Sequence, residues 1–496
     1  MTVKHFDVLV LGAGLSGIGA GYHLQKNCPS KTYAILEARE DLGGTWDLFR
    51  YPGIRSDSDM FTLGYSFRPW TSNKSIVDGS EILQYLRDTS REFGIDSNIR
   101  YGHRVIAAAW SSDEARWTLD IEVGEQRTPV QYSCNFFYVC SGYYSYEGGY
   151  QPDFPGLENY TGQLIHPQQW PEGLDYSGKR IVVIGSGATA VTLVPALAKR
   201  AAHVTMLQRS PSYVMSLPDD DVIAKAMRKV LPSSWVHKTV RFKNVMLSTA
   251  IYRLFRFKPE FAKRLLRKGI AAHLPQDFPI DTHFKPSYNP WDQRLCLVPN
   301  GDLFTALREQ SASIVTDRIS SFTATGITLE SGQSLDADIV VSATGLKLVA
   351  CGGVQLTVDG APVTIGQTYS YKGLMLSGIP NAAVCVGYTN ASWTLRADLS
   401  SEFVCRLINY MSRKNYDQCR PQIDPSEMDQ RPLLDMTSGY ILRAVEQFPK
   451  QGKQQPWQQN QNYLQDLLSM KFTTLDDKAL KFSRAHAAST SLKQSA

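Results

Sequence analysis

The sequence predicts an α/β protein with two Rossmann-like dinucleotide-binding domains and a helical insertion. Apolar runs at residues 7–11 and 181–184 each turn through closely spaced glycines into a small-residue stretch, the pattern of a strand, a phosphate loop and a helix. A basic amphipathic stretch, residues 225–268, interrupts the second domain. We place the first domain at residues 1–150 and 375–496, the second at 151–216 and 291–374, and the insertion at 217–290.

The first glycine loop carries Gly12, Gly14 and Gly17, and Glu37 ends the next apolar run. Gly12 and Gly14 suit a tight turn and a close backbone approach to a pyrophosphate. A carboxylate about twenty residues beyond such a loop accepts hydrogen bonds from both hydroxyls of an unphosphorylated ribose. The first site is therefore predicted to bind a dinucleotide without a 2′-phosphate.

The second loop differs at the position that selects the ribose. It consists of Gly185, Ser186, Gly187, Ala188 and Thr189. Arg209 and Ser210 follow the next apolar run, where an NAD-selective unit places an acid. Taken alone, Arg209 is equally well a surface cation, but a fixed cation also suits a 2′-phosphate. Because the two loops carry opposite charges at this position, we predict FAD at the first site and NADPH at the second.

A further glycine-rich segment follows Glu37. Gly44, Thr45 and Trp46 lead toward the turn-rich residues 50–59. Glycines beside an aromatic side chain suit a loop that wraps against a flat cofactor. The alternative is an ordinary connection, and composition alone does not separate the two.

Composition excludes several classes of function. The 52 Lys and Arg against 47 Asp and Glu give a net charge of +5, which is too mild to indicate nucleic-acid binding. Eight cysteines stand singly, without a C-x-x-C pair or a histidine cluster. This favours reduced, buried thiols over disulfides or a zinc site, so we predict no metal. No stretch approaches the roughly twenty apolar residues of a membrane span, and a cytoplasmic location is predicted.

Between the two loops lies the segment Tyr160-x-Gly162-x-x-x-His166-x-x-x-Trp170-Pro171. It resembles the fingerprint of type I Baeyer–Villiger monooxygenases, within the flavin-containing monooxygenase superfamily, although that family usually has Phe where this chain has Tyr160. The resemblance extends through residues 43–46, 50–57, 185–190, 209, 290–296, 343–345 and 387–399. Residues 50–59, 387–399, 431–440 and 449–463 resemble the subgroup that contains the ethionamide-activating monooxygenase and the flavin monooxygenases linked to long-chain alkane growth.

The resemblance implies roles for four residues. Arg294 corresponds to the active-site arginine over the flavin, where a permanent positive charge stabilises the negative charge that develops during oxygen transfer. Asp57 corresponds to the carboxylate that holds this arginine. His166 lies in the linker between the domains and is assigned to coupling domain motion with NADPH. On its own it better suits a hydrogen-bonded residue near a turn, and its position between the two loops reverses that preference. Trp170 is placed beside the NADP site, more as a packing anchor than as a stacking partner.

The implied activity is insertion of one oxygen atom from O2 beside the carbonyl of a hydrophobic ketone, with sulfide oxidation as a related reaction. Within this fold the alternatives are terminal hydroxylation of long alkanes and oxygenation of nitrogen or sulfur only. A disulfide reductase of similar layout needs a redox-active cysteine pair, which the isolated cysteines argue against. A non-catalytic nucleotide-binding protein is the remaining alternative.

The insertion admits two interpretations. Residues 225–268 hold many Lys and Arg side chains, interleaved with large apolar ones, and a single acid, Glu260. Such a stretch suits a helical lid with a solvated basic face, which we favour, or a helix pair that lies on an anionic membrane surface.

Overall fold

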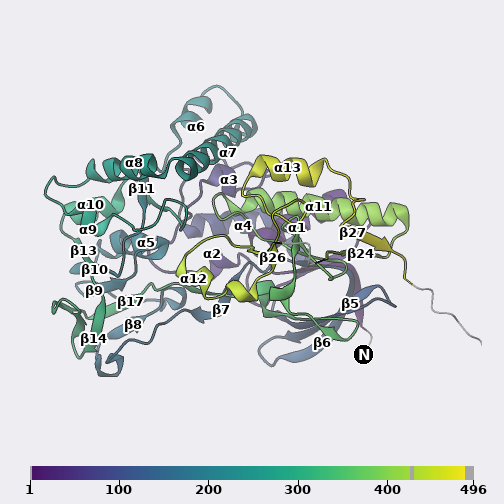
Figure 1. Ribbon diagram of the computed structural model, residues 1–496, viewed down its shortest axis with the longest axis horizontal. Coiled ribbons are helices and arrows are strands. Elements are labelled where there is room, and N and C mark those ends of the chain that lie inside the picture. Colours follow the sequence, from purple (N-terminus) through teal and green to yellow (C-terminus); the bar gives the residue numbers. More distant parts are fainter. Residues whose placement is uncertain (1–2, 425–428, 486–496) are drawn as a thin grey trace, which may run out of the picture.

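The computed structural model describes residues 3–424 and 429–485. Figure 1 shows two lobes, each built around a sheet, with helices α6, α7 and α8 along the top. The predicted α/β class, with two Rossmann-like units and a helical insertion, is confirmed. The elements of the first lobe come from both ends of the chain, because the second lobe is inserted between them.

The first sheet has the strand order β20-β19-β4-β5-β6-β1-β2-β3, with β23 also paired to β6. Strand β1 is parallel to β2 and β6, and β4, β5 and β6 form an antiparallel meander. The strands are β1 Lys4–Leu11, β2 Tyr33–Leu36, β3 Ile99–Arg100, β4 His103–Ser111, β5 Arg116–Val123, β6 Thr128–Val139, β19 Gln355–Val358, β20 Ala361–Pro362 and β23 Ala382–Val384. Helices α1 (Leu15–Asn27) and α11 (Trp393–Lys414) share one buried core with this sheet.

The second sheet is entirely parallel, in the order β13-β10-β9-β17-β8. Its strands are β8 Gln163–Ile165, β9 Arg180–Ile184, β10 His203–Gln208, β13 Ala312–Thr316 and β17 Ile339–Ser342. Helices α5 (Ala188–Leu197) and α10 (Asp302–Arg308) pack against it in a separate core. The fully buried β-branched run of β9 is what a strand covered on both faces requires.

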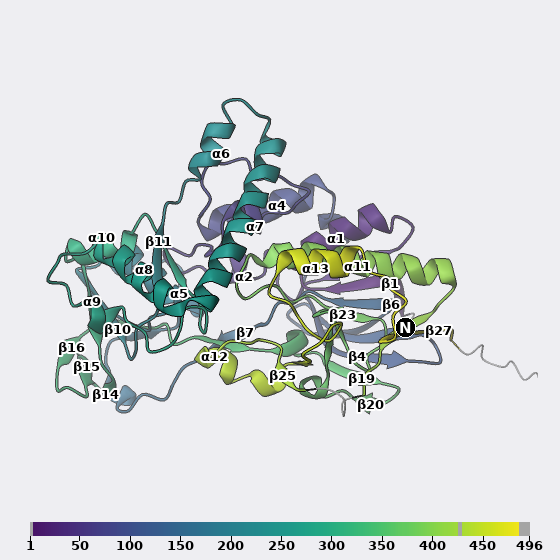
Figure 2. The same cartoon turned by 45° about the horizontal axis from the view of Figure 1, so that its top comes forward.

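Two antiparallel strands connect the lobes. They are β7 (Tyr144–Gly149), which follows the first sheet, and β18 (Leu346–Leu348), which follows the second. Figure 2 shows β7 in the region between the two lobes. Residues on and around this strand pair therefore lie between the two lobes, where a movement of either lobe would shift them.

The remaining elements are connections and covers. The helices are α2 Thr45–Leu48, α3 Met60–Leu63, α4 Gly79–Glu92, α6 Val222–Met227, α7 Ser233–Phe257, α8 Pro259–Ala271, α9 Ile280–His283, α12 Gly439–Leu442 and α13 Tyr463–Lys471. The strands are β11 Val214–Leu217, β12 Cys296–Pro299, β14 Ile319–Thr323, β15 Gly326–Leu329, β16 Ser334–Asp336, β21 Ser370–Tyr371, β22 Met375–Leu376, β24 Gln418–Pro421, β25 Arg431–Pro432, β26 Lys450–Gln451 and β27 Leu480–Ser483.

The structure differs from the predicted domain limits in the segment before residue 375. Strand β19, which the sequence assigned to the second domain, pairs in parallel with β4 of the first sheet, and β20 extends that edge. Leu356 of β19 is buried in the core of the first lobe. These strands are too short to show a period in the sequence. We keep the predicted limits as a proposal, with residues 351–374, whose buried side chains join the cores of the first lobe, moved to the first domain.

The insertion is held to the first lobe by the inner face of α7. His237 is 1% exposed, and its Nδ1 accepts a hydrogen bond of 3.2 Å from the backbone N–H of Trp70. Burial, together with Arg241 and Arg228 nearby, lowers the pKa of His237 from 6.5 to about 4. The imidazole is therefore neutral in the folded protein, and its Nε2 carries the proton.

This burial predicts a loss of stability in acid. Between about pH 6.5 and pH 4 the unfolded chain binds a proton at His237 that the folded chain does not, so the free energy of unfolding falls as the pH falls through this window. At roughly 1.4 kcal/mol per pH unit the loss reaches about 3 kcal/mol. In His237→Asn, which keeps an acceptor for the Trp70 N–H, the unfolding midpoint should depend less on pH. The same change at exposed His5 is the matched control.

Candidate active site

A cavity of about 1670 Å³ lies between the two lobes, and residues of both glycine loops line it. Its lining includes the carboxyl ends of parallel strands. Leu11 ends β1, Leu36 ends β2, Ile184 ends β9, and Leu207 is the next-to-last residue of β10. Ligands of open α/β sheets bind at these strand ends. The volume exceeds the roughly 300–1,000 Å³ of a site for one small ligand, so two extended ligands have room.

The first loop takes the predicted form. Gly12 has φ 97°, and a Cβ there would lie 3.0 Å from the carbonyl oxygen of Cys140. Gly12 and Gly14 line the cavity. Gly17 does not: a Cβ on it would lie 1.8 Å from the Gly12 carbonyl oxygen, so this glycine lets α1 pack against the loop. We predicted that Gly17 contacts the cofactor. In the structure it contacts the backbone of Gly12 instead.

Glu37 fixes the shape of this loop. Its carboxylate accepts hydrogen bonds from the backbone N–H groups of Ala13, at 2.7 Å, and Arg39, at 3.0 Å. The side chain lines the cavity although only 5% of the residue is exposed, and burial raises the pKa of its carboxyl despite those bonds. Each oxygen keeps a lone pair that a ribose hydroxyl can use.

The glycine-rich segment after Glu37 lies against the first loop. Gly44 has φ 57°, and a Cβ on it would lie 3.1 Å from the Cα of Gly14. Thr45 begins the short helix α2 directly after this contact. Gly44, Thr45 and Trp46 all line the cavity. The segment therefore lines the cavity, which composition alone could not decide.

Arg294 lines the cavity from the second lobe, just before β12. Its Nη2 donates a hydrogen bond of 3.0 Å to the phenol oxygen of Tyr143, and its buried Nε has no partner among the described residues. Tyr143, and after it Tyr440, hold the pKa of the guanidinium well above its usual range. The site thus contains a permanent cation with one donor still free.

Asp57 lines the same cavity, in the loop before α3. Burial raises the pKa of its carboxyl, while Arg294 and Arg55 lower it. Among the described residues no hydrogen bond or ion pair joins Asp57 to Arg294, and Arg55 pairs instead with Asp302 at 2.5 Å. The implied role of Asp57 in holding Arg294 is taken in this structure by Tyr143. The carboxylate acts on the guanidinium through space.

The second loop opens toward the cavity. Gly185 has φ 137°, and a Cβ there would lie 2.4 Å from the carbonyl oxygen of Ala343 at the end of β17. The Ser186 hydroxyl donates to the carbonyl oxygen of Ser210 at 2.9 Å. The lining includes Gly185, Ser186, Gly187, Ala188, Thr189, Arg209 and Ser210. Around Gly187 there is open space, which leaves room for a ligand at the start of α5.

Arg209 is exposed, and its guanidinium makes no hydrogen bond or ion pair with the described residues. Arg318, between β13 and β14, lines the same side of the cavity and is also exposed. The sequence pointed to Arg209 through its place after β10. No comparable signal in the sequence points to Arg318. This residue lines the same cavity as Arg209 because β13, which precedes Arg318, lies beside β10 in the sheet.

His166 lies where the connecting strands meet the second sheet. Its Nε2 donates to the carbonyl oxygen of Gly345 at 3.1 Å, and its Nδ1 accepts from the Gln168 N–H at 3.2 Å. A Cβ on Gly149 of β7 would lie 1.8 Å from the ring, so only glycine fits there. Burial lowers the pKa of His166, which makes it a neutral link between β7 and the loop after β17.

Trp170 lies outside the cavity lining. Its ring is half-buried and meets the ring of Tyr176 edge-on, with centroids 6.3 Å apart. The predicted contact with NADP is therefore not made from this position. The packing role, which the sequence favoured for this residue, is the one that the structure shows.

The lining contains unsatisfied polar atoms. Arg39 Nε, Arg55 Nε, Gln168 Oε1 and Arg294 Nε are buried, belong to lining residues and have no partner among the described residues. Leaving such atoms unpaired costs about 1–3 kcal/mol each. Polar ligands along the cavity would satisfy them, and two glycine loops with one acid and one cation are the donor set that two different dinucleotides need.

Comparison with known proteins identifies the family. A family model described as flavin-binding monooxygenase-like matches residues 7–234. The FAD-containing monooxygenase EthA of Mycobacterium tuberculosis is 53% identical over 485 residues, which cover 98% of this chain and 99% of EthA. The chain belongs to the flavin-binding monooxygenase family. The probable FAD-binding monooxygenase AlmA of an Acinetobacter species is 49% identical over 481 residues, 97% of this chain and 96% of AlmA.

Solved structures share the fold of this monooxygenase. Oxidized steroid monooxygenase bound to NADP has a TM-score of 0.75 at 22% identity, with 97% of this chain and 100% of that chain covered. OTEMO complexed with FAD and NADP has a TM-score of 0.70 at 22% identity, with 85% and 88% covered. Cyclohexanone monooxygenase from Rhodococcus sp. Phi1, bound to NADP+, has a TM-score of 0.70 at 23% identity, with 86% and 87% covered.

These findings confirm the predicted class of enzyme, a flavoprotein monooxygenase with the fold of the Baeyer–Villiger enzymes, and the predicted cofactors agree with the names of these relatives. Within residues 3–424 and 429–485, no helix has both the length and the apolar character to cross a bilayer.

Three further residues of this monooxygenase line the cavity without having been singled out from the sequence. Tyr143 follows β6, whereas Tyr440 and Arg443 come from α12 and the residue after it. The Arg443 guanidinium lies over the ring of Tyr150, 3.6 Å from its centroid. The only signal for Tyr440 is the resemblance of residues 431–440 to the subgroup. Nothing in the local sequence shows that α12 returns to the cavity.

Proposed function

We propose that this monooxygenase uses FAD, NADPH and O2 to insert one oxygen atom beside the carbonyl of hydrophobic ketones, giving esters or lactones, and that it also oxidises sulfides. The balanced reaction converts ketone, NADPH, H+ and O2 into ester, NADP+ and water. The observation that carries the proposal is Arg294, a permanent cation with a free buried donor in the cavity shared by both glycine loops.

In this proposal the first loop, Glu37 and residues 44–46 hold FAD, which supplies electron transfer and O2 activation when bound. The second loop, with Arg209, holds NADPH. Arg294 stabilises negative charge in the transition state of oxygen transfer, and its donation to Tyr143 orients the guanidinium. Asp57 tunes that charge through space. His166, fixed between Gln168 and Gly345, links nucleotide binding to the strands between the lobes.

Product analysis tests the proposal. The purified protein, loaded with FAD, is given NADPH and a panel of aliphatic ketones, sulfides, amines and alkanes, and hydrogen peroxide is measured in parallel. Esters from ketones and sulfoxides from sulfides are expected. Oxidation of sulfides and amines without any ester, or terminal alcohols from alkanes, would overturn the assignment and favour one of the two alternative oxygenations.

Replacement of Arg209 tests the second nucleotide site. In Arg209→Ala a 2′-phosphate loses a charged partner, and since hydrogen bonds to charged groups contribute about 1.5–3 kcal/mol, KM for NADPH should rise by about ten- to a hundredfold. KM for NADH should stay nearly unchanged. Steady-state rates with both nucleotides measure this, and Lys199→Ala, an exposed cation of the same lobe, is the control. Equal effects on both nucleotides would remove the argument for NADPH selection.

We also propose that the protein is cytoplasmic and that residues 225–268 make peripheral contact with a membrane. All eight cysteines are free and buried, which supports a reducing, cytoplasmic location.

A further inference from the structure

We propose that helices α6, α7 and α8 form a docking surface for anionic lipid membranes. We call residues 222–271 the helical platform. Of the seventeen large hydrophobic side chains that are exposed in the described chain, twelve belong to the platform. They are Val222, Ile223, Val230, Leu231, Trp235, Phe242, Met246, Leu247, Leu254, Phe257, Phe261 and Leu265. Soluble monomers rarely expose apolar side chains in such a concentration, and concentrations of this kind mark interaction sites.

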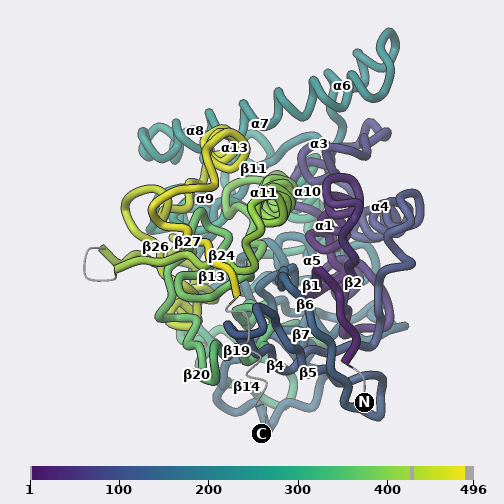
Figure 3. The backbone as a smooth tube through the Cα atoms, turned by 90° about the vertical axis from the view of Figure 1, so that its right-hand side faces the viewer, coloured from purple at the N-terminus to yellow at the C-terminus, as the bar shows by residue number. Residues whose placement is uncertain are grey.

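The exposed side chains of α7 form a stripe. Trp235, Phe242, Met246 and Phe257 recur at spacings of seven, four and eleven residues, which places them on one face of the helix. Phe257 is 80% exposed, Trp235 66% and Phe242 63%. On α8, Phe261 and Leu265 continue the pattern one turn apart. Figure 3 shows α6, α7 and α8 in a row along one side of the molecule.

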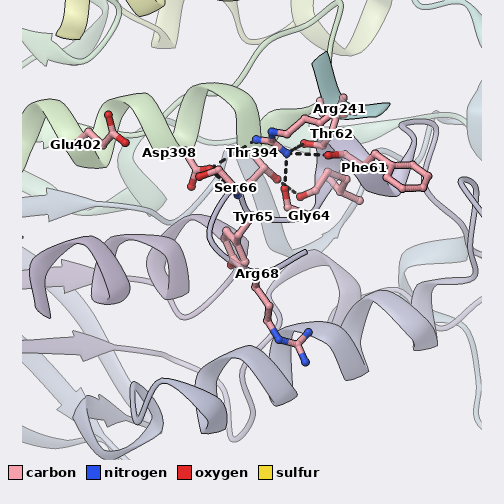
Figure 4. Close-up of polar contacts among 12 residues, drawn as sticks. Phe61, Thr62, Gly64, Tyr65, Ser66, Arg68, Arg241, Thr394, Asp398 and Glu402 are labelled. Atoms are coloured by element: carbon pink, nitrogen blue, oxygen red, sulfur yellow. Dashed lines mark hydrogen bonds and ion pairs between the residues drawn. The ribbon is translucent and has the colours of Figure 1, made fainter. Parts of the chain in front are cut away.

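The inner face of α7 is fixed to the first lobe. Arg241 is buried, and its Nη1 donates to the carbonyl oxygens of Phe61, Thr62 and Gly64 at 2.7–3.1 Å. Its Nη2 lies 3.6 Å from Asp398 of α11. Figure 4 shows this guanidinium surrounded by its acceptors. Because a buried charge held by four partners resists withdrawal, the platform is a rigid support for its outer face.

The platform does not act as a wall of the active site. No residue between 217 and 290 belongs to the cavity lining among the described residues. The lid interpretation, which we favoured from the sequence, therefore has no contact to support it. The apolar stripe on the outer face of α7 therefore needs a binding partner from outside the chain.

The net charge of the platform indicates which kind of partner binds there. The platform carries thirteen Lys and Arg against one acid, Glu260, a net charge of +12, so the other residues share −7 of the chain's net +5. Six of the thirteen side chains are exposed and make no hydrogen bond or ion pair among the described residues: Lys225, Lys229, Lys238, Arg253, Lys258 and Lys268. Lys238 and Arg253 lie on the same face of α7 as the apolar stripe.

An apolar stripe flanked by free cations matches a bilayer surface that carries negative headgroups. The apolar rings enter the boundary between headgroups and chains while Lys and Arg reach the phosphates. A second copy of this chain fits less well, since a two-fold contact would bring two surfaces of +12 together. The proposal is independent of the oxygenation reaction, because none of these residues lines the cavity.

Vesicle binding by the full-length, FAD-loaded protein tests the inference. Cosedimentation is measured with phosphatidylcholine vesicles and with vesicles that also contain phosphatidylglycerol, at low and high salt. We expect binding to the anionic vesicles at low salt and release at high salt. Lys238→Glu with Arg253→Glu should weaken binding by about tenfold or more, and Trp235→Ser with Phe242→Ser should weaken it to a similar extent.

The control pair is Lys199→Glu with Lys481→Glu, which changes the net charge by the same amount at exposed positions outside the platform. It should retain the binding of the natural chain. Absence of sedimentation, equal binding to neutral vesicles, or an equal loss in the control pair would overturn the proposal. A concentration-dependent dimer that the platform variants dissociate, without vesicle binding, would overturn it in favour of self-association. NADPH oxidation with a water-soluble ketone, measured for every variant, reports folding separately from membrane binding.

Discussion

Replacing Arg294 with Met is expected to reduce ester formation from ketones by about 100- to 1,000-fold, the loss typical of removing one preorganised group that stabilises an oxyanion. The side chain supplies a permanent charge in the cavity and keeps a free Nε there. Methionine keeps an unbranched side chain as far as the position of Nε and removes the guanidinium with its charge. NADPH consumption should continue, because the second glycine loop and Arg209 are untouched, and hydrogen peroxide should replace the ester as the oxygen product.

Two milder variants separate the effect of the positive charge of Arg294 from the effect of the orientation of its guanidinium. Arg294→Lys keeps a cation but loses the planar fork, so part of the activity should return. Tyr143→Phe keeps the guanidinium and removes the 3.0 Å hydrogen bond that orients it, and a loss of about tenfold in ester formation is expected. Ester yield and peroxide are measured together for all three. An Arg294→Met enzyme that makes ester at the rate of the natural protein would refute the assigned role.

Local sequence predicted the parts of the site that are built from neighbouring residues. A glycine loop, the strand before it and the acid or cation after the next strand lie within a few tens of residues of each other, and their order fixes their geometry. Gly12, Gly14 and Glu37 line the cavity for this reason, as do Gly185, Gly187 and Arg209.

The parts that needed the structure depend on contacts between distant segments. Tyr143 reaches Arg294 from the other lobe, and α12 brings Tyr440 and Arg443 back from the end of the chain. Conversely, Gly17 and Trp170 belong to motifs of the site but pack within the fold. A motif records that a residue is needed at a position, and only its surroundings show whether it touches the ligand or supports a neighbour.

Arg396 illustrates this distinction in the segment 387–399, which resembles the family. Its residue exposure is 0%, although arginine is almost never fully buried without a partner. Its Nη1 donates to the Asp466 carboxylate of α13, and its Nη2 donates to the carbonyl oxygen of Lys372 at 2.6 Å. A Cβ on Gly373 would lie 2.2 Å from the guanidinium. The residue therefore ties α11, α13 and the turn after β21 into one core.

Arg396→Met should consequently lower the stability of the protein strongly. The oxygenation rate of the molecules that remain folded should change little. Removing one partner of a buried ion pair leaves the other charge uncompensated and costs about 3–5 kcal/mol, which lowers the unfolding midpoint by roughly 6–20 °C in a domain of about two hundred residues. Adding Asp466→Leu removes the stranded carboxylate and should restore much of the loss. Thermal unfolding of the single and double variants measures both steps. A double variant no more stable than Arg396→Met would show that the uncompensated Asp466 carboxylate is not the source of the loss, and would overturn this account.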